Sequence, residues 1–172
     1  MLFLETFMFF STEFDSPIGS LQICFSDKGV RKVFLPGRAC NNNDEMLSAS
    51  RRHPLAVQAL EELSQYFSGN RQRFELPLDV DGTEFQMKVW KSLAEIKYGA
   101  TKTYGAQAKR VGSPKAARAV GAANAANPIP IILPCHRVIG ANGALTGYGG
   151  GSSLLYIKEF LLDLEKANSP LT

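Results

Sequence analysis

Cysteine and histidine are scarce in this sequence, which has 3 cysteines and 2 histidines in 172 residues. Cys24, Cys40 and Cys135 form no Cys-x-x-Cys pair, and so small, odd a number is not the disulfide framework of a small secreted protein. Cys24, Cys40 and His53 also lack the compact spacing of zinc ligands. We therefore expect no metal, no cofactor and a reducing compartment, which is the cytoplasm or, in a eukaryote, the nucleus.

Long hydrophobic runs are also absent. No stretch approaches the roughly 20 apolar residues that cross a bilayer. The apolar opening Met1-Leu2-Phe3-Leu4 is interrupted by Glu5, has no basic segment before it and no small-residue cleavage site after it. We therefore expect neither a signal peptide nor a membrane partner.

The remaining composition is ordinary for a globular protein, with 45% hydrophobic and 20% charged residues, enough for one domain or two small ones. Charge is divided unevenly. Residues 1–81 carry 8 Lys and Arg against 11 Asp and Glu, a net charge of −3, whereas residues 82–172 carry 11 against 5, a net charge of +6. This division suggests that the second half, and not the first, meets a polyanion.

Residues 1–81 are expected to form a small α+β domain that serves as a scaffold. Apolar residues within 7–14, 21–25 and 30–35 alternate with polar ones between turn sequences, which predicts an antiparallel sheet. Residues 36–52 have the composition of a loop. Residues 74–80 are a candidate further strand.

A helix is expected after Pro54, a favoured residue for the first helical position. Its apolar face is predicted to hold Val57, Leu60, Leu63 and Phe67, with Gly69 at its end. No residue of the first half forms a chemical constellation.

Residues 82–172 are expected to form an all-α domain. Thr83-Glu84-Phe85-Gln86 is a capping box ahead of a helix over 83–97. Thr103 is expected to cap a short helix ending at Gly112, and Ser113-Pro114 to start the next, the arrangement of a helix-turn-helix. A last helix is expected over 152–166, with its inward residues being Leu154, Ile157, Leu161 and Leu164.

Alanine dominates the second helix of this helix-turn-helix. An alanine-rich helix has few side chains that can hydrogen-bond to the edges of DNA bases. This composition favours binding in a narrow groove without sequence preference, and Lys109, Arg110 and Lys115 are expected to contact phosphates. An alanine-rich helix that only packs in a core is the alternative.

Cys135 and His136 lie side by side after a proline-rich apolar segment that begins at Asn127. A cysteine reacts as the thiolate, and a histidine held by a carboxylate can take its proton. Neighbouring residues on a strand point to opposite faces, so the two must meet across a turn or through water. Glu165, near the apolar stripe of the last helix, would complete a Cys-His-Glu relay. A core cysteine and a solvated glutamate are the alternatives.

Four motifs occur in order within residues 83–166. They are Lys115-Ala116-Ala117-Arg118-Ala119-Val120-Gly121, Asn127-Pro128-Ile129-Pro130, Pro134-Cys135-His136-Arg137-Val138 and Lys158-Glu159-Phe160-Leu161-Leu162. Together they closely resemble the O6-alkylguanine-DNA alkyltransferases, and their ordered occurrence is far more specific than a lone Cys-His pair. The Asp15-Ser16-Pro17-Ile18-Gly19 turn also resembles the start of that family's N-terminal domain.

The resemblance implies a DNA-repair protein that flips O6-alkylguanine, and also O4-alkylthymine, out of double-stranded DNA. It would transfer the alkyl group irreversibly to its own cysteine in a single turnover. The expected partner is double-stranded DNA, bound by a monomer through the minor groove without sequence specificity. Flipping costs about a few kcal/mol, which a filled stack and a snug pocket offset.

The resemblance also implies roles for individual residues. Cys135 is the acceptor, and His136, oriented by Glu165, removes its proton through water. Tyr104 assists flipping and protonates the departing guanine, and Asn127 ties the helix-turn-helix to the active-site segment. Arg118 enters the stack in place of the flipped base. The further predicted DNA-binding residues are Tyr104, Ala117, Ser113, Lys115 and Arg137, and the predicted pocket residues are Val138, Tyr148 and Gly149.

The resemblance has limits, and two rival classes are left open. The N-terminal zinc ligands of some members have no match, and no cysteine-rich regulatory module is fused to the chain. Gly149 stands where some relatives have serine, so the range of alkyl sizes is open. One rival is a lesion binder without an acceptor cysteine, against which Cys135 argues. The other is a cysteine hydrolase with a Cys135-His136-Glu165 triad.

Overall fold

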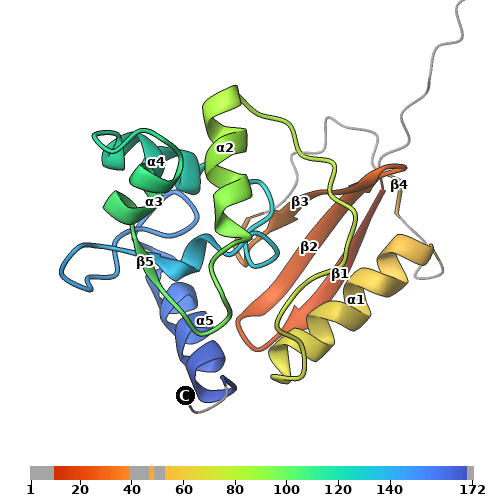
Figure 1. Cartoon of the computed structure of the whole chain (residues 1–172). Helices are drawn as coiled ribbons and strands as arrows, with labels where there is room; N and C mark the ends of the chain where they lie inside the picture. Colours follow the sequence, from red (N-terminus) through yellow and green to blue (C-terminus); the bar gives the residue numbers. More distant parts are fainter. Residues whose placement is uncertain (1–9, 39–46, 49–52, 170–172) are drawn as a thin grey trace, which may run out of the picture.

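A computed structural model describes residues 10–38, 47–48 and 53–169. An antiparallel sheet with one helix is followed by a group of shorter helices, and the two parts lie against each other (Figure 1). Buried side chains from both parts form one hydrophobic core. The predicted α+β class is confirmed. Within the described ranges, no helix has the length and apolar character that a bilayer span requires.

The sheet has the strand order β3-β2-β1-β4. Strands β1 (Phe10–Ser16), β2 (Gly19–Ser26) and β3 (Gly29–Phe34) form the predicted antiparallel meander. The expected loop over 36–52 is corrected at one point, because Leu47–Ser48 forms β4 and pairs in parallel with β1.

The predicted strand over 74–80 is wrong. Only Leu78 forms a bridge, to Val30, flanked by hydrogen bonds from Val30 N to Pro77 O and from Asp79 N to Val30 O, each 2.9 Å. Pro77 has no N–H to donate, which prevents a continuous ladder at this point.

Helix α1 (Pro54–Phe67) packs along β1, but on a different face from the predicted one. Val57 is 46% exposed, and Leu60 and Phe67 are only partly buried. The buried face is centred on two small alanines, Ala56 and Ala59, which allow the helix to approach its neighbours closely. The buried residues are Ala56, Ala59, Glu62, Leu63 and Tyr66.

Helix α2 (Glu84–Leu93) begins with the predicted capping box, in which Thr83 and Gln86 satisfy each other's backbone N–H groups. It ends four residues earlier than predicted. The chain after Leu93 continues only in turns, and the carbonyl of Ile96 accepts a hydrogen bond from Arg137 Nη1 at 2.6 Å. The N–H groups of Glu95 and Ile96 donate three residues back, to Ser92 O and Leu93 O, so the chain turns here instead of continuing the α-helix.

Helices α3 (Tyr104–Arg110) and α4 (Ala117–Ala125) pack together as the expected helix-turn-helix, with Thr103 capping α3. The predicted start of α4 is corrected. Ser113 to Ala116 form a turn, closed by a 2.8 Å hydrogen bond from Ala116 N to Ser113 O. Serine followed by proline suits a β-turn as well as a helix start, so sequence could not separate the two.

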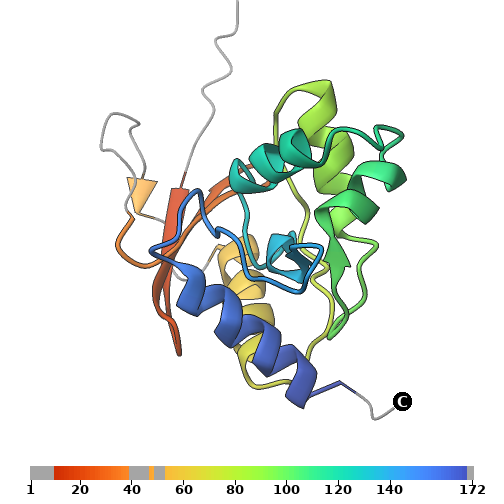
Figure 2. The ribbon, with the colours of Figure 1, turned by 90° about the vertical axis from the view of Figure 1, so that its left-hand side faces the viewer.

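The second half is not purely helical. Strands β5 (Lys102–Thr103) and β6 (Val138–Ile139) form a short parallel pair. A 3₁₀ helix, η1 (Cys135–Arg137), precedes β6, and α3 follows β5, so the pair brings the start of α3 beside the cysteine. Figure 2 shows η1 in the interior, between α5 (Leu155–Ala167) and the α3–α4 pair.

Candidate active site

The segment before the cysteine is held by one side chain, that of Asn127. Its Oδ1 accepts a hydrogen bond from Ile129 N at 3.1 Å, and its Nδ2 donates to Leu133 O at 2.8 Å. Ile131 has a φ of 75°, an unusual and costly value for a β-branched residue. The segment holds this conformation because Ile129 and Ile131 are fully packed in the core.

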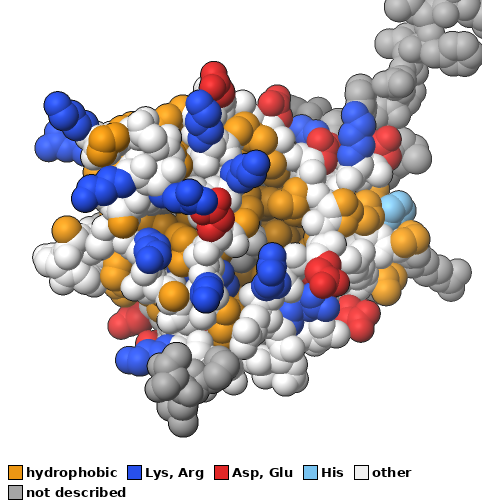
Figure 3. Space-filling view, viewed as in Figure 1, with side chains coloured by type: hydrophobic (Ala, Val, Ile, Leu, Met, Phe, Trp, Pro, Cys, Tyr) orange, Lys and Arg blue, Asp and Glu red, His pale blue; other side chains and the backbone are white. Residues whose placement is uncertain are grey.

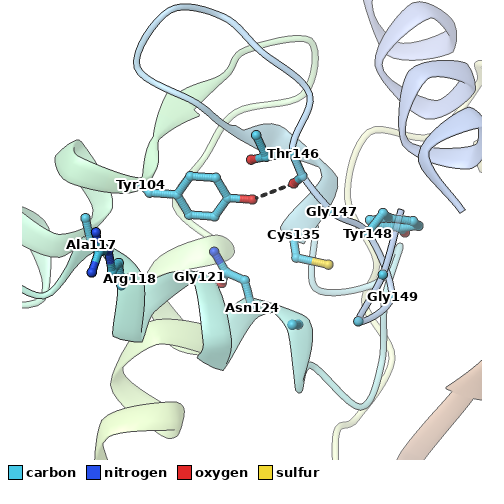
Figure 4. A pocket seen from close by; sticks show the side chains of 13 residues that line it. Tyr104, Ala117, Arg118, Gly121, Asn124, Cys135, Thr146, Gly147, Tyr148 and Gly149 are labelled. Atoms are coloured by element: carbon cyan, nitrogen blue, oxygen red, sulfur yellow. Dashed lines mark hydrogen bonds between the residues drawn. The ribbon is translucent and has the colours of Figure 1, made fainter. Parts of the chain in front are cut away.

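Cys135 is only 6% exposed, and its sulfur points into a cavity (Figure 4). Burial raises the pKa of the thiol, and a hydrogen bond from Asn127 and the charge of Lys158 only partly oppose this. The resting group is therefore a thiol, and a base must take its proton before the sulfur can attack.

His136 follows Cys135 in the chain and is held by Glu165. Its Nε2 lies 2.7 Å from Glu165 Oε1, and both side chains are completely buried. Burial alone would raise the pKa of Glu165, but hydrogen bonds and charge from His136 and Arg137 lower it to about 2. The ionised carboxylate is an acceptor only, so Nε2 carries the hydrogen.

The other imidazole nitrogen, Nδ1 of His136, carries the lone pair. It is buried and has no hydrogen-bond partner among the described residues. Burial lowers the pKa of His136 despite the opposing effect of Glu165. A neutral imidazole with a free acceptor nitrogen is the protonation state that a general base requires.

Arg137 does not lie where a DNA contact would need it, and this corrects its predicted role. The residue is 6% exposed, its Nε lies 2.8 Å from Glu165 Oε2 and its Nη2 lies 2.9 Å from Oε1. Its third donor, Nη1, is bonded to Ile96 O. The guanidinium compensates a buried carboxylate, which would be costly to bury alone.

Tyr66 is a site residue that sequence reasoning missed. It lies on α1, in the half expected to be only a scaffold, and its hydroxyl donates to Glu165 Oε1 at 2.7 Å. Its spacing of three from Leu63 gave a clue, because a tyrosine on a buried helix face needs a partner for its hydroxyl.

Lys158 was also missed as a site residue. It is 1% exposed, and its Nζ donates to Val138 O at 2.6 Å and to the carbonyls of Thr146 and Gly147 at 3.4 Å each. Burial lowers its pKa, and a Cys135 thiolate would oppose that shift. A lysine seven residues before Glu165 lies on the same helix face, which was the available signal.

The cavity in front of Cys135 has a volume of about 530 Å³. Tyr104 forms one wall, and its hydroxyl donates to Thr146 O at 3.0 Å, the dashed bond in Figure 4. The predicted pocket residues Tyr148 and Gly149 line it. Ala117 and Arg118 from α4, which were predicted to contact DNA, line it as well.

Other predicted site residues lie behind the cavity lining. Asn127, His136 and Glu165 support Cys135 from the interior, and Val138 is buried, with its carbonyl engaged by Lys158. Ser113 and the exposed Lys115 lie in the turn before α4.

The backbone conformation at position 149 favours glycine. Its φ is +57°, and a Cβ there would lie 2.9 Å from Leu154 Cδ1 and 3.1 Å from Leu35 Cδ1. A serine at this position would need the loop or its neighbours to shift.

Metal ligands are not gathered anywhere in the described part of the chain, where no three His, Cys, Asp or Glu side chains are close enough to hold an ion. Cys40, one of the residues considered for zinc, lies outside the described ranges.

Known proteins match this chain over nearly its whole length. A family model for the "6-O-methylguanine DNA methyltransferase, ribonuclease-like domain" matches residues 9–80, and one for the "DNA binding domain" of the same family matches residues 84–167. The methylated-DNA–protein-cysteine methyltransferase of Methanosarcina acetivorans is 47% identical over 161 residues, covering 88% of this chain and 95% of that protein. The constitutive enzyme of Bacillus subtilis is 42% identical, covering 92% and 96%.

Solved structures agree with these matches. The crystal structure of Mycobacterium tuberculosis O6-methylguanine methyltransferase is 41% identical and superposes with a TM-score of 0.84, covering 96% of this chain and 97% of that one. A crystal structure of the M. tuberculosis OGT in complex with DNA superposes with a TM-score of 0.81 at the same identity, covering 95% of each chain. The chain therefore belongs to the 6-O-methylguanine DNA methyltransferase family.

Proposed function

We propose that this chain is a methylated-DNA–protein-cysteine methyltransferase that reverses alkylation damage directly. Its substrates are O6-alkylguanine and O4-alkylthymine in double-stranded DNA, and the acceptor is Cys135. One observation carries the proposal: the Cys135 thiol opens into a base-sized cavity, while a buried His136–Glu165 pair lies behind it. Such a constellation suits alkyl transfer to sulfur from a base that has left the duplex.

The reaction begins when the Cys135 proton passes through a water molecule to His136 Nδ1. The thiolate then attacks the alkyl carbon, forming a carbon–sulfur bond while the carbon–oxygen bond breaks. The electron pair stays on the guanine, which takes a proton from the Tyr104 hydroxyl. That hydroxyl lies at the cavity wall and must exchange its acceptor, Thr146 O, for the base.

The product is an S-alkyl cysteine, which has no easy leaving path. The enzyme is therefore consumed by one turnover. The free thiol also requires the reducing compartment that the low cysteine content favours, either the cytoplasm or a eukaryotic nucleus.

DNA would lie across α4. Arg118 is exposed at the edge of the cavity and would fill the gap left by the flipped base, while Ala117 permits close approach to the minor groove. Lys115 and Ser113 lie just before α4, in position for phosphates. In Figure 3 Lys and Arg side chains are spread over the helical half of the molecule, which favours binding by charge without sequence specificity.

We also propose that the predicted boundary between residues 81 and 82 separates two parts of the chain with different roles. Residues 82–172 would bind DNA and carry the acceptor, and residues 1–81 would support them as part of a monomer. Tyr66 is the exception, since it enters the site from the first half.

Mass spectrometry after incubation with duplex DNA containing one O6-methylguanine tests the proposal. We expect one methyl group per protein chain, located on the peptide that contains Cys135, and no further reaction with excess DNA. Repeated turnover on ester or amide substrates, without a stable mass increase, would identify the rival cysteine hydrolase instead.

A further inference from the structure

Glu165 Oε1 is shared by three donors from two elements, α1 and η1. Tyr66 OH on α1 and His136 Nε2 on η1 each lie 2.7 Å from it, and Arg137 Nη2 lies 2.9 Å away. The second oxygen, Oε2, accepts from Arg137 Nε at 2.8 Å and from Gly99 N at 3.0 Å. The carboxylate is therefore fully used by donors in the interior.

Tyr66 differs from the other donors because it belongs to the first half of the chain and lies close to both Glu165 and His136. It is separated from Glu165 by 99 residues and is completely buried. Its hydroxyl oxygen also lies 3.5 Å from His136 Nε2. Because the hydroxyl donates to the carboxylate, it competes with the imidazole for the same oxygen.

The competition has an electrostatic consequence. Each donor on Oε1 takes up part of the negative charge that would otherwise draw on the His136 Nε2–H group. A carboxylate with fewer donors would stabilise the imidazolium more strongly, and His136 would then hold a proton at higher pH.

Charged groups around His136 come from several elements. Of the side chains that share Glu165 with His136, only Tyr66 can lose its contact without a change of charge. Tyr98, after α2, lies against both Tyr66 and Arg137 but has a buried hydroxyl with no partner among the described residues. The groups that act on His136 are Glu165 and Lys158 on α5, Arg137 on η1 and Tyr66 on α1, and Cys135 precedes it in the chain.

We propose that Tyr66 is a positioning residue of alkyl transfer: by sharing Glu165 Oε1 with His136, it limits the pull of that carboxylate on the imidazole and keeps Nδ1 an acceptor for the thiol proton. The role in transfer rests on the proposed function. It gives the first half of the chain a direct part in the chemistry, beyond support of the fold.

The test compares Tyr66→Phe with Tyr98→Phe in the full chain. Both changes remove one buried hydroxyl from the same aromatic cluster, but only the first removes a donor to Glu165. Rates of single-turnover transfer from O6-methylguanine DNA are measured across pH. We expect the acid limb of the profile to move up by about half to one pH unit in Tyr66→Phe, since one unit is tenfold in the protonation equilibrium. Tyr98→Phe should retain the wild-type limb.

Nuclear magnetic resonance of ¹⁵N-histidine-labelled chain gives a readout that does not depend on transfer. The sequence has only His53 and His136, so a His53→Gln variant assigns the signals. In Tyr66→Phe the Nε2-bound proton of His136 should move downfield, as its bond to Glu165 strengthens, and Tyr98→Phe should leave it in place.

The outcomes separate this inference from the function on which it rests. Unchanged His136 signals in a folded Tyr66→Phe variant would overturn the role of Tyr66, whether or not the rate falls. Equal shifts in both variants would also overturn it, because they would report a general loosening of the aromatic cluster. A wild-type chain that takes up no methyl group, yet shows the Tyr66-specific signal shift, would refute the proposed function and leave the coupling standing.

Discussion

Arg137 and Glu165 form a two-point ion pair in the interior, with Nε 2.8 Å from Oε2 and Nη2 2.9 Å from Oε1. The same carboxylate holds His136, so the charge that the proposed mechanism uses is also the charge that Arg137 compensates in the interior. Stability and activity are therefore expected to share a dependence on the ionisation of Glu165.

Acid should destabilise the protein through Glu165. Its pKa is about 2 in the folded chain against an ordinary value of 4.5, so the unfolded chain takes up the proton first as pH falls. The stabilisation is complete above about pH 4.5 to 5 and is lost as pH falls toward 2. Urea unfolding of wild type and Glu165→Gln at a series of pH values measures this. The variant should be less stable by about 3–5 kcal/mol at pH 7, with a flatter acid dependence; parallel curves would count against an ionised Glu165.

Replacing Cys135 by alanine should abolish alkyl transfer and leave DNA affinity within about twofold of wild type, because the buried thiol makes no phosphate contact. Transfer is followed by the loss of labelled methyl groups from DNA, and affinity by a gel or anisotropy assay. Cys24→Ala, in strand β2, serves as the control and should retain transfer. Residual transfer in the Cys135 variant would place the acceptor at Cys24 or Cys40.

Arg118→Ala distinguishes stacking from phosphate binding. If Arg118 fills the gap left by the flipped base, transfer from duplex DNA should slow by about tenfold or more, since flipping costs about a few kcal/mol. Reaction with the free base O6-benzylguanine, which needs no flipping, should stay near wild type. Single-turnover rates on both substrates decide the matter, and equal slowing on both would assign Arg118 to the pocket or the fold.

Lys115→Ala is the matched control for Arg118, because Lys115 is exposed in the turn before α4 and lies outside the cavity lining. It should weaken DNA binding uniformly and lower the salt dependence by about one counterion. A duplex-specific loss of transfer rate in this variant would contradict the division between phosphate contact and stacking.

Lys158→Met should loosen the loop that forms one side of the cavity. The change leaves the carbonyls of Val138, Thr146 and Gly147 without their shared donor, and we expect a loss of about 1–3 kcal/mol in unfolding free energy. Hydrogen exchange should accelerate in residues 144–148. Lys88→Met, at an exposed ion pair on α2, should change neither quantity measurably. Similar effects in the two variants would argue against a specific role for Lys158.

Local patterns in the sequence predicted the elements that local forces decide. The capping box at Thr83 and the Thr103 cap are present, because a helix start depends on side chains three residues away. The meander follows from turns of two residues between alternating segments. The start of α4 was misplaced because the serine–proline segment forms a turn, and the end of α2 was misplaced because the chain after Leu93 also forms turns.

The sequence by itself determined the chemistry of this protein, because the ordered motifs around Cys135 and the alanine-rich helix identify residue types and spacings that need no third dimension to be recognised. Only the tertiary structure decided which polar groups meet. Arg137 lies in the interior beside Glu165, and Tyr66 contacts the same carboxylate although the two residues are 99 positions apart in the sequence. The physical reason is that a polar side chain is buried only where distant parts of the chain supply its partners, and such partners leave no periodic trace in the sequence.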